Sequence, residues 1–230
     1  MKKIFLFTAL TALLLAACGQ QQQPQETSEA ISIYTVEPGD STRYGLACEG
    51  CTDSILVLLP YEGGDPDTLD IAQAFINHRI YGRPHTGDKM AVIMSPDSTG
   101  EVLTAVNIST LNGEWSYQVT PVLSPHHPNM PPLPDSIRQR IMAPRTYSLV
   151  LKNGGMAFSK GAYRQNSDKM SPVKYPELRR YARWHLYNGK LVLLGDSSSR
   201  QQPDTATILL LRSDSLVLRF SNHEQEYHKK

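Results

Sequence analysis

Three tight-turn signals in the second half of the chain constrain its fold most strongly. Asn153-Gly154, Asn188-Gly189 and Ser213-Asp214 each lie between two apolar runs. Asn-Gly is the strongest short-range hairpin signal, because a type I′ turn needs positive φ at both central residues. A strand from Trp115 before these hairpins and one over residues 225–228 after them give about eight strands in meander order. A sheet of that size closes naturally into a small barrel, which removes the exposed edges of a flat sheet.

The first half of the chain also has strand signals and lacks long helical periodicity. Turn-rich segments, such as residues 62–66 and 95–97, separate the apolar runs. The predicted strands cover residues 42–47, 54–59, 68–72, 79–81, 89–94 and 102–109. Residues 70–79 have a second interpretation as one short helix with an apolar face. The sequence therefore predicts an all-β protein, with a smaller β-domain over 42–110 and a meander barrel over 111–230.

Residues 120–144 form a proline-rich excursion inside the predicted barrel domain. This segment contains seven prolines, which is too many for a central strand. Asp135 is predicted to cap one short helix that runs through Met142, with Ile137 and Ile141 facing inward. We expect a long excursion of this kind to act as a flap over a barrel mouth.

The first 18 residues indicate export and lipidation. Lys2 and Lys3 precede an uncharged run that ends in Leu15-Ala16-Ala17-Cys18. The run is shorter than the roughly 20 residues of a transmembrane helix, and its charged start and small-residue end are typical of a cleaved signal. The segment resembles the signal of bacterial lipoproteins, which implies that Cys18 is lipidated and anchors the chain to a membrane. The alternative is a secretory signal that is cut without lipidation.

Residues 19–41 begin as a Gln-rich, apolar-poor tether, which we expect to be disordered. Gly19, rather than Asp, follows the cysteine, as in lipoproteins of the outer membrane. The acidic cluster that marks surface export in Bacteroidota lipoproteins is missing there, which favours the periplasmic face over the cell surface. Loss of Lys2 and Lys3 with the signal changes the formal charge from +1 to −1. A near-neutral domain has no electrostatic reason to bind nucleic acid.

Gly113-Glu114-Trp115, followed by a meander, resembles the start of a lipocalin-type barrel, in which a Trp closes one end. Residues 147–163 and 181–220 resemble the lipocalin-like domain of NlpE-type lipoproteins, which are copper-resistance and envelope-stress sensors. Cys48-Glu49-Gly50-Cys51 resembles the Cys-x-x-Cys strand opening of that family. In the family this motif begins the barrel, whereas here about 60 residues separate the two signals. Residues 42–110 are therefore expected to form an OB-like barrel of their own or to be an insertion.

Cys48 and Cys51 are the two cysteines that remain once Cys18 is lipidated. A disulfide between them would close a very short loop and constrain the unfolded chain little. An inert disulfide, a metal site and redox chemistry therefore all stay open. Two thiolates suit copper(I) or zinc(II) but need further ligands. The candidates are His126, His127 and Met130, for which a solvated loop is the alternative interpretation.

The sequence favours a binding or sensing role over an enzymatic one. It lacks a Gly-x-Ser-x-Gly elbow, a His-Glu-x-x-His motif, a phosphate loop and a dinucleotide fingerprint. We expect the barrel to take a small apolar ligand, or its surface to bind an envelope protein, with no cofactor. The alternatives are an NlpE-like metal sensor, with copper first, and a structural or assembly lipoprotein. The predicted ligand-lining residues are Trp115, Tyr147, Phe158 and Trp184.

The same strand pattern predicts which side chains of the barrel wall face inward. In residues 181–187, Trp184 and Leu186 should face the core, while Tyr181, Arg183 and His185 should face outward. An eight-stranded barrel can fill its interior with side chains instead of holding a ligand. The small-ligand hypothesis therefore requires a cavity of roughly 300 Å³ or more.

Overall fold

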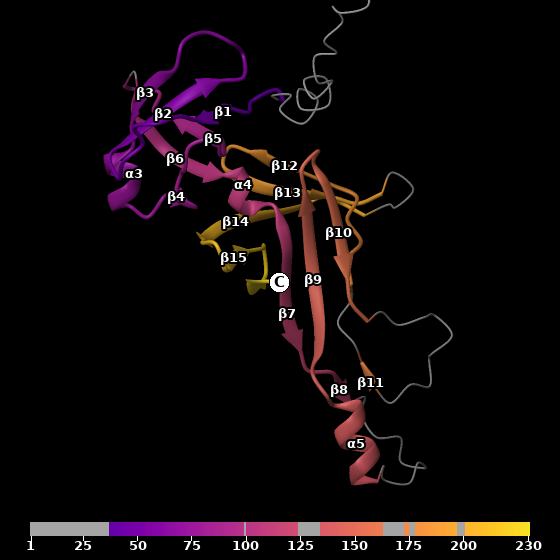
Figure 1. Cartoon of the computed structure of the whole chain (residues 1–230). Helices are drawn as coiled ribbons and strands as arrows, with labels where there is room; N and C mark the ends of the chain where they lie inside the picture. Colours follow the sequence, from indigo (N-terminus) through magenta and orange to yellow (C-terminus); the bar gives the residue numbers. More distant parts are fainter. Residues whose placement is uncertain (1–36, 99, 124–133, 163–172, 175–177, 197–200) are drawn as a thin grey trace, which may run out of the picture.

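The computed structural model describes residues 37–98, 100–123, 134–162, 173–174, 178–196 and 201–230. These residues form a closed eight-stranded antiparallel barrel and a separate six-stranded mixed sheet, as predicted for an all-β chain. Figure 1 shows the sheet in indigo and magenta beside one end of the barrel. The predictions for Cys18 and the tether up to residue 36, and for His126, His127 and Met130, lie outside the described ranges.

The first unit is a curled sheet with one short helix. Its elements are β1 (Thr42–Ala47), β2 (Ile55–Pro60), β3 (Asp67–Asp70), α3 (Ala72–Ile76), β4 (Ile80–Tyr81), β5 (Lys89–Met94) and β6 (Val102–Asn107). The sheet order is β3-β2-β1-β5-β6-β4, with β4 parallel to β6. A parallel bridge between Asp70 and Glu101 brings β3 against the chain just before β6. The five strands other than β4 thus make a partly open barrel with OB-like connectivity.

Strand alternation explains how this OB-like unit packs. Met90 and Val92 of β5 lie in the core of the unit, while Ala91 between them packs on the opposite face, against the barrel. The alternative interpretation of residues 70–79 as a short helix is confirmed only over Ala72–Ile76, while the predicted strand over 68–72 is present as β3 and ends at Asp70. Ala74 of this helix is buried, whereas Phe75 is largely exposed.

The second unit is the meander barrel. Its strands are β7 (Gly113–Val119), β9 (Arg145–Lys152), β10 (Met156–Lys160), β12 (Arg183–Tyr187), β13 (Lys190–Leu194), β14 (Asp204–Leu211), β15 (Ser215–Arg219) and β16 (Glu224–Lys229). Each strand pairs with its neighbour in this order, and β16 pairs with β7 to close the wall. The predicted count of about eight meander strands is confirmed.

The two Asn-Gly turns differ from each other. Asn188 and Gly189 join Tyr187 to Lys190 with φ values of 47° and 74°, as a type I′ turn requires. The loop at Gly154 has three residues instead, because Lys152 pairs with Met156. There the positive φ values fall on Gly154 (92°) and Gly155 (67°) and not on Asn153. The type I′ prediction was wrong at that loop, because a second glycine follows the Asn-Gly pair.

The excursion between β7 and β9 contains β8 (Val122–Leu123) and α5 (Asp135–Ile141), and β8 pairs with β11 (Val173–Lys174). The predicted helix at Asp135 is confirmed, but its expected inward face is not. No residue of α5 is buried, and Ile137 is 44 % exposed. Figure 1 shows α5 beyond the ends of β7 and β9, far from the OB-like unit. Within the described ranges, no helix combines the length and the hydropathy that crossing a membrane requires.

The barrel end that faces the OB-like unit is filled by side chains. The short helix α4 (Ile108–Leu111) leads into β7, and the indole N–H of Trp115 donates a 2.7 Å hydrogen bond to the carbonyl of Leu111. The ammonium of Lys229 lies 4.9 Å from the Trp115 ring centroid and donates to the carbonyl of Thr110. Trp115 is fully buried. This end of the barrel is therefore closed.

Candidate functional site

The opposite end of the barrel holds a cavity of about 440 Å³. That volume exceeds the roughly 300 Å³ at which small-molecule sites begin. Its lining combines aromatic and polar side chains. The aromatic ones are Tyr117, Tyr181, Phe220 and Tyr227, and the polar ones include Ser159, Arg179, Asp204, Asn222, His223 and Gln225.

Strand alternation places these side chains at successive depths. On β7, Trp115 and Tyr117 share the inward face, so Tyr117 lies one level closer to the mouth than the buried indole. On β16, Lys229 lies beside Trp115 in the closed end, and Tyr227 and Gln225 follow toward the mouth. The cavity thus begins where the packed end of the barrel stops.

A cluster of tyrosines lies at the inner end of the cavity. The rings of Tyr117 and Tyr227 meet edge to face, with centroids 5.1 Å apart, and Tyr147 lies 5.6 Å from Tyr117. The hydroxyl of Tyr147 donates a 2.8 Å hydrogen bond to the carbonyl of Ala162. Among the residues that the structure describes, the hydroxyls of Tyr117 and Tyr227 have no hydrogen-bond partner. Burial raises the pKa values of both phenols, so they stay protonated at neutral pH.

A cluster of hydrogen-bonded and ion-paired side chains lies at the mouth of the cavity. The hydroxyl of Tyr181 donates a 2.7 Å hydrogen bond to Asp204, which also forms an ion pair with Arg179. Burial, and then the hydrogen bond to the carboxylate, raise the pKa of Tyr181. The Asp204 carboxylate at the start of β14 is therefore already satisfied by two neighbours.

Tyr181 corrects one expectation from the strand pattern. The structure confirms that Trp184 and Leu186 face inward, since they are 4 % and 2 % exposed. Tyr181, however, packs against the barrel core instead of facing outward with Arg183. The reason is that β12 begins only at Arg183, so the alternation does not extend back to Tyr181.

The four predicted ligand-lining residues lie in different places. Trp115 and Trp184 are buried in the barrel core but do not line the cavity, and the Trp184 indole donates to the carbonyl of Lys152. Tyr147 is buried, and its ring packs against that of the cavity residue Tyr117. Phe158 is 41 % exposed on the outer wall, 5.5 Å from the Lys152 ammonium.

Phe158 is a correction to the expected lining set. The fully buried Ala157 faces the interior from β10, so its neighbour Phe158 must face outward. Tyr117 and Tyr227 were not among the residues predicted from the sequence, although the strand period places both on inward-facing positions. Tyr117 lies two residues after Trp115, and Tyr227 lies in the predicted strand 225–228.

The two cysteines lie in the loop between β1 and β2, and their half-buried thiols are not joined in a disulfide. The sulfur of Cys51 lies 3.2 Å from the carbonyl oxygen of Cys48 and packs against the core of the OB-like unit. Within the described part of the chain, no group of three His, Cys, Asp or Glu side chains could hold a metal ion. The structure therefore provides no third ligand for a Cys48/Cys51 metal site among these residues.

No protein-family model, no curated protein and no solved structure matches this chain. The resemblance to NlpE-type lipoproteins accordingly stays a prediction. The fold and the cavity define the chain as an all-β protein with a barrel that is closed at one end and hollow at the other.

Proposed function

We propose that this chain is a lipid-anchored envelope protein that binds a small molecule in the mouth of its barrel and does not convert it. The observation that carries the proposal is the 440 Å³ cavity, where the Tyr117 and Tyr227 hydroxyls lack partners among the described residues. Both residues line the cavity, so their hydroxyls are placed to form hydrogen bonds with a ligand. The proposed anchor is Cys18, which would hold the barrel at the periplasmic face of the outer membrane.

The lining indicates the chemistry of the ligand. Aromatic rings favour a flat or apolar body, while the free phenols favour a hydroxyl, carbonyl or amide group on it. Because Arg179 and Tyr181 already satisfy Asp204, this ionic cluster leaves no unpaired charge at the mouth. The proposed ligand is therefore uncharged and partly polar, rather than wholly apolar as the sequence suggested.

The geometry also supports binding without turnover. His223 stacks on Phe220 with ring centroids 5.0 Å apart, and its ring nitrogen contacts the side chain of Asn222. Among the described lining residues, no serine or threonine hydroxyl bonds to His223. Such a nucleophile–base pair is the usual sign of covalent catalysis.

Calorimetry with 2-naphthol, an uncharged aromatic alcohol, tests this proposal. We expect saturable 1:1 binding that Ser159→Phe abolishes, because the new ring occupies the cavity from β10. The Tyr117→Phe/Tyr227→Phe variant should bind about 10-fold more weakly, as expected for the loss of two hydrogen bonds. Thr207→Phe, which adds the same ring on the outer face of β14, is the matched control. Equal binding by the wild type and Ser159→Phe would contradict the proposal.

A further inference from the structure

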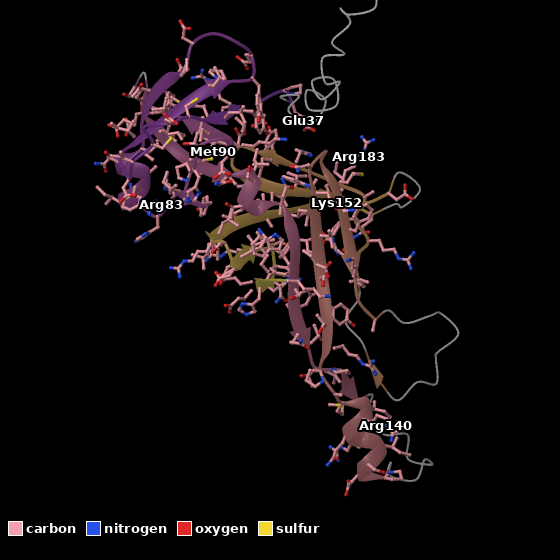
Figure 2. All side chains as sticks on the ribbon, in the orientation of Figure 1. Glu37, Arg83, Met90, Arg140, Lys152 and Arg183 are labelled. Carbon is pink, nitrogen blue, oxygen red and sulfur yellow. The ribbon has the colours of Figure 1, made fainter. Side chains whose placement is uncertain are left out.

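A second cavity, of about 590 Å³, lies between the OB-like unit and the barrel. The two units meet there through a 3.1 Å backbone hydrogen bond from Gly82 to the carbonyl of Leu211. Figure 2 shows Arg83 below α3, on the side of the OB-like unit that faces β14. We call this cavity the interdomain groove. Its lining includes Phe75, Ile80, Tyr81, Leu209, Leu210 and Leu211.

The barrel side of the groove is apolar because of a β-bulge. Ile208 pairs with Leu218 and Leu210 pairs with Val217, which leaves Leu209 without a partner on β15. Ile208 is fully buried inside the barrel, whereas Leu209 and Leu210 are both partly exposed and line the groove. Bulges reorient side chains and are frequent next to functional sites. Here the bulge adds a leucine to a barrel wall that faces water.

The other side of the groove contains a strained histidine. Helix α3 ends with hydrogen bonds from the backbone N–H groups of His78 and Arg79 to the carbonyls of Phe75 and Ala74. This is a Schellman motif, whose left-handed position is usually occupied by Gly. His78 occupies that position with φ of 55°, and its side chain lines the groove. Strain of this kind is often retained for a function.

The rim of the groove is positively charged. Arg83 and Arg212 line the groove. Arg79 lies near Tyr81: burial raises the pKa of the Tyr81 phenol, and the positive charge of Arg79 partly opposes this rise. Asp53 is the one acidic residue of the described lining, and it pairs with Arg83 at 3.4 Å. Among the described residues, neither Arg79 nor Arg212 forms an ion pair.

We infer that the interdomain groove binds a free anionic amphiphile, such as a fatty-acid-like carboxylate. Its apolar chain would lie on Phe75, Tyr81 and Leu210, and its anionic head would meet the arginines of the rim. The volume is within the usual range for small-molecule sites, and the unpaired cations supply the charge complementarity that selects an anion. This site is distinct from the barrel mouth and takes a ligand of different charge.

Calorimetry on the full chain with the single substitution Cys18→Ser, which prevents lipidation, tests the inference. The probe is monomeric dodecanoate, and dodecyltrimethylammonium is the matched amphiphile of opposite charge. We expect 1:1 binding of dodecanoate, at least 10-fold tighter than binding of the cation. Arg212→Gln should weaken dodecanoate binding 3- to 10-fold, whereas Arg138→Gln on the distant helix α5 should not change it.

Three further measurements separate the alternatives. Leu210→Asp should abolish dodecanoate binding. If the Leu210→Asp variant does not fold, Arg212→Gln, at an exposed residue, still tests the inference. Ser159→Phe should leave dodecanoate binding unchanged, because Ser159 lines the barrel cavity and not the groove. Loss of binding in this variant would place dodecanoate in the barrel mouth instead. Binding to phosphatidylglycerol vesicles without binding of the monomer would identify a membrane surface instead. Equal affinity for the anion and the cation, or no effect of Arg212→Gln, would overturn the inference.

Discussion

The hydroxyl of Tyr44 donates a hydrogen bond of 3.1 Å to the backbone carbonyl of Leu186, which joins β1 of the OB-like unit to β12 of the barrel. Tyr44 also belongs to the same core cluster as Trp115 and Trp184, together with Ala91 from β5. The core cluster of the barrel therefore extends onto one face of the OB-like unit, which also has a separate core of its own. An extensive apolar interface of this kind restricts relative motion between domains.

We predict that the two units unfold in one transition. Both tryptophans lie in the barrel, so their fluorescence reports the barrel, while far-UV circular dichroism reports all strands. The two urea transitions should coincide in the wild type. Tyr44→Ala should cost about 3–5 kcal/mol through its cavity and separate the two transitions, whereas Tyr44→Phe should cost about 1 kcal/mol. Separate transitions in the wild type would show that the packing of Tyr44 and Ala91 against the barrel core does not couple the units.

Alkaline pH should destabilise the fold through the cavity tyrosines. Burial raises the pKa values of Tyr117, Tyr181 and Tyr227 above the ordinary value of 10. Their contribution to stability is therefore fully present below pH 10 and is lost as the pH rises further, because the unfolded phenols ionise first. The Tyr117→Phe/Tyr227→Phe variant should show a shallower loss of urea midpoint above pH 10. Phe158→Leu, at an exposed non-titrating residue of β10, is the control that should keep the wild-type slope.

Acid should remove a stabilising ion network on β7. The Glu114 carboxylate lies 2.5 Å from the Lys160 ammonium and 3.2 Å from that of Lys230. The hydrogen bond from Lys160 is the main cause that lowers the pKa of Glu114 to about 2. Its stabilisation is present above pH 4.5 and is lost as the pH falls toward 2.

Glu114→Gln should therefore cost about 0.5–1 kcal/mol at pH 7, the scale of partly exposed ion pairs, and almost nothing at pH 2. Urea denaturation at both pH values measures the difference. Glu226→Gln, an exposed residue of β16, is the matched control. A cost for Glu114→Gln that does not change with pH would assign the effect to packing instead of charge.

A methyl group at Gly161 should destabilise the barrel. A Cβ atom built there would lie 2.2 Å from the Tyr147 ring, although the backbone at Gly161 does not have positive φ. Gly161→Ala should therefore cost about 1–3 kcal/mol through overpacking. The smaller side chain in Tyr147→Leu should restore part of this loss in the double variant. Additive costs in the double-mutant cycle would exclude the steric contact as the cause.

The barrel was predictable from local patterns, because turns and alternation are encoded within a few residues. The Asn188-Gly189 turn and the inward side chains Trp184 and Leu186 follow from such patterns alone. The contact of Tyr181 with Asp204 was not predictable, because it joins segments 23 residues apart across a loop. The bulge at Leu209 depends on its register with β15. The interdomain groove combines α3 and β14, which only the folded chain brings together.

Replacing His78, which lines the interdomain groove, with Gly should stabilise the chain. The left-handed φ of 55° costs an L-residue about 1 kcal/mol, whereas Gly adopts it freely. His78→Gly should therefore raise the free energy of unfolding in urea by up to about 1 kcal/mol. Asn77→Gly, at the preceding residue with φ of −84°, should give no such gain. A loss of stability in His78→Gly would show that packing of the imidazole in the groove outweighs the backbone strain.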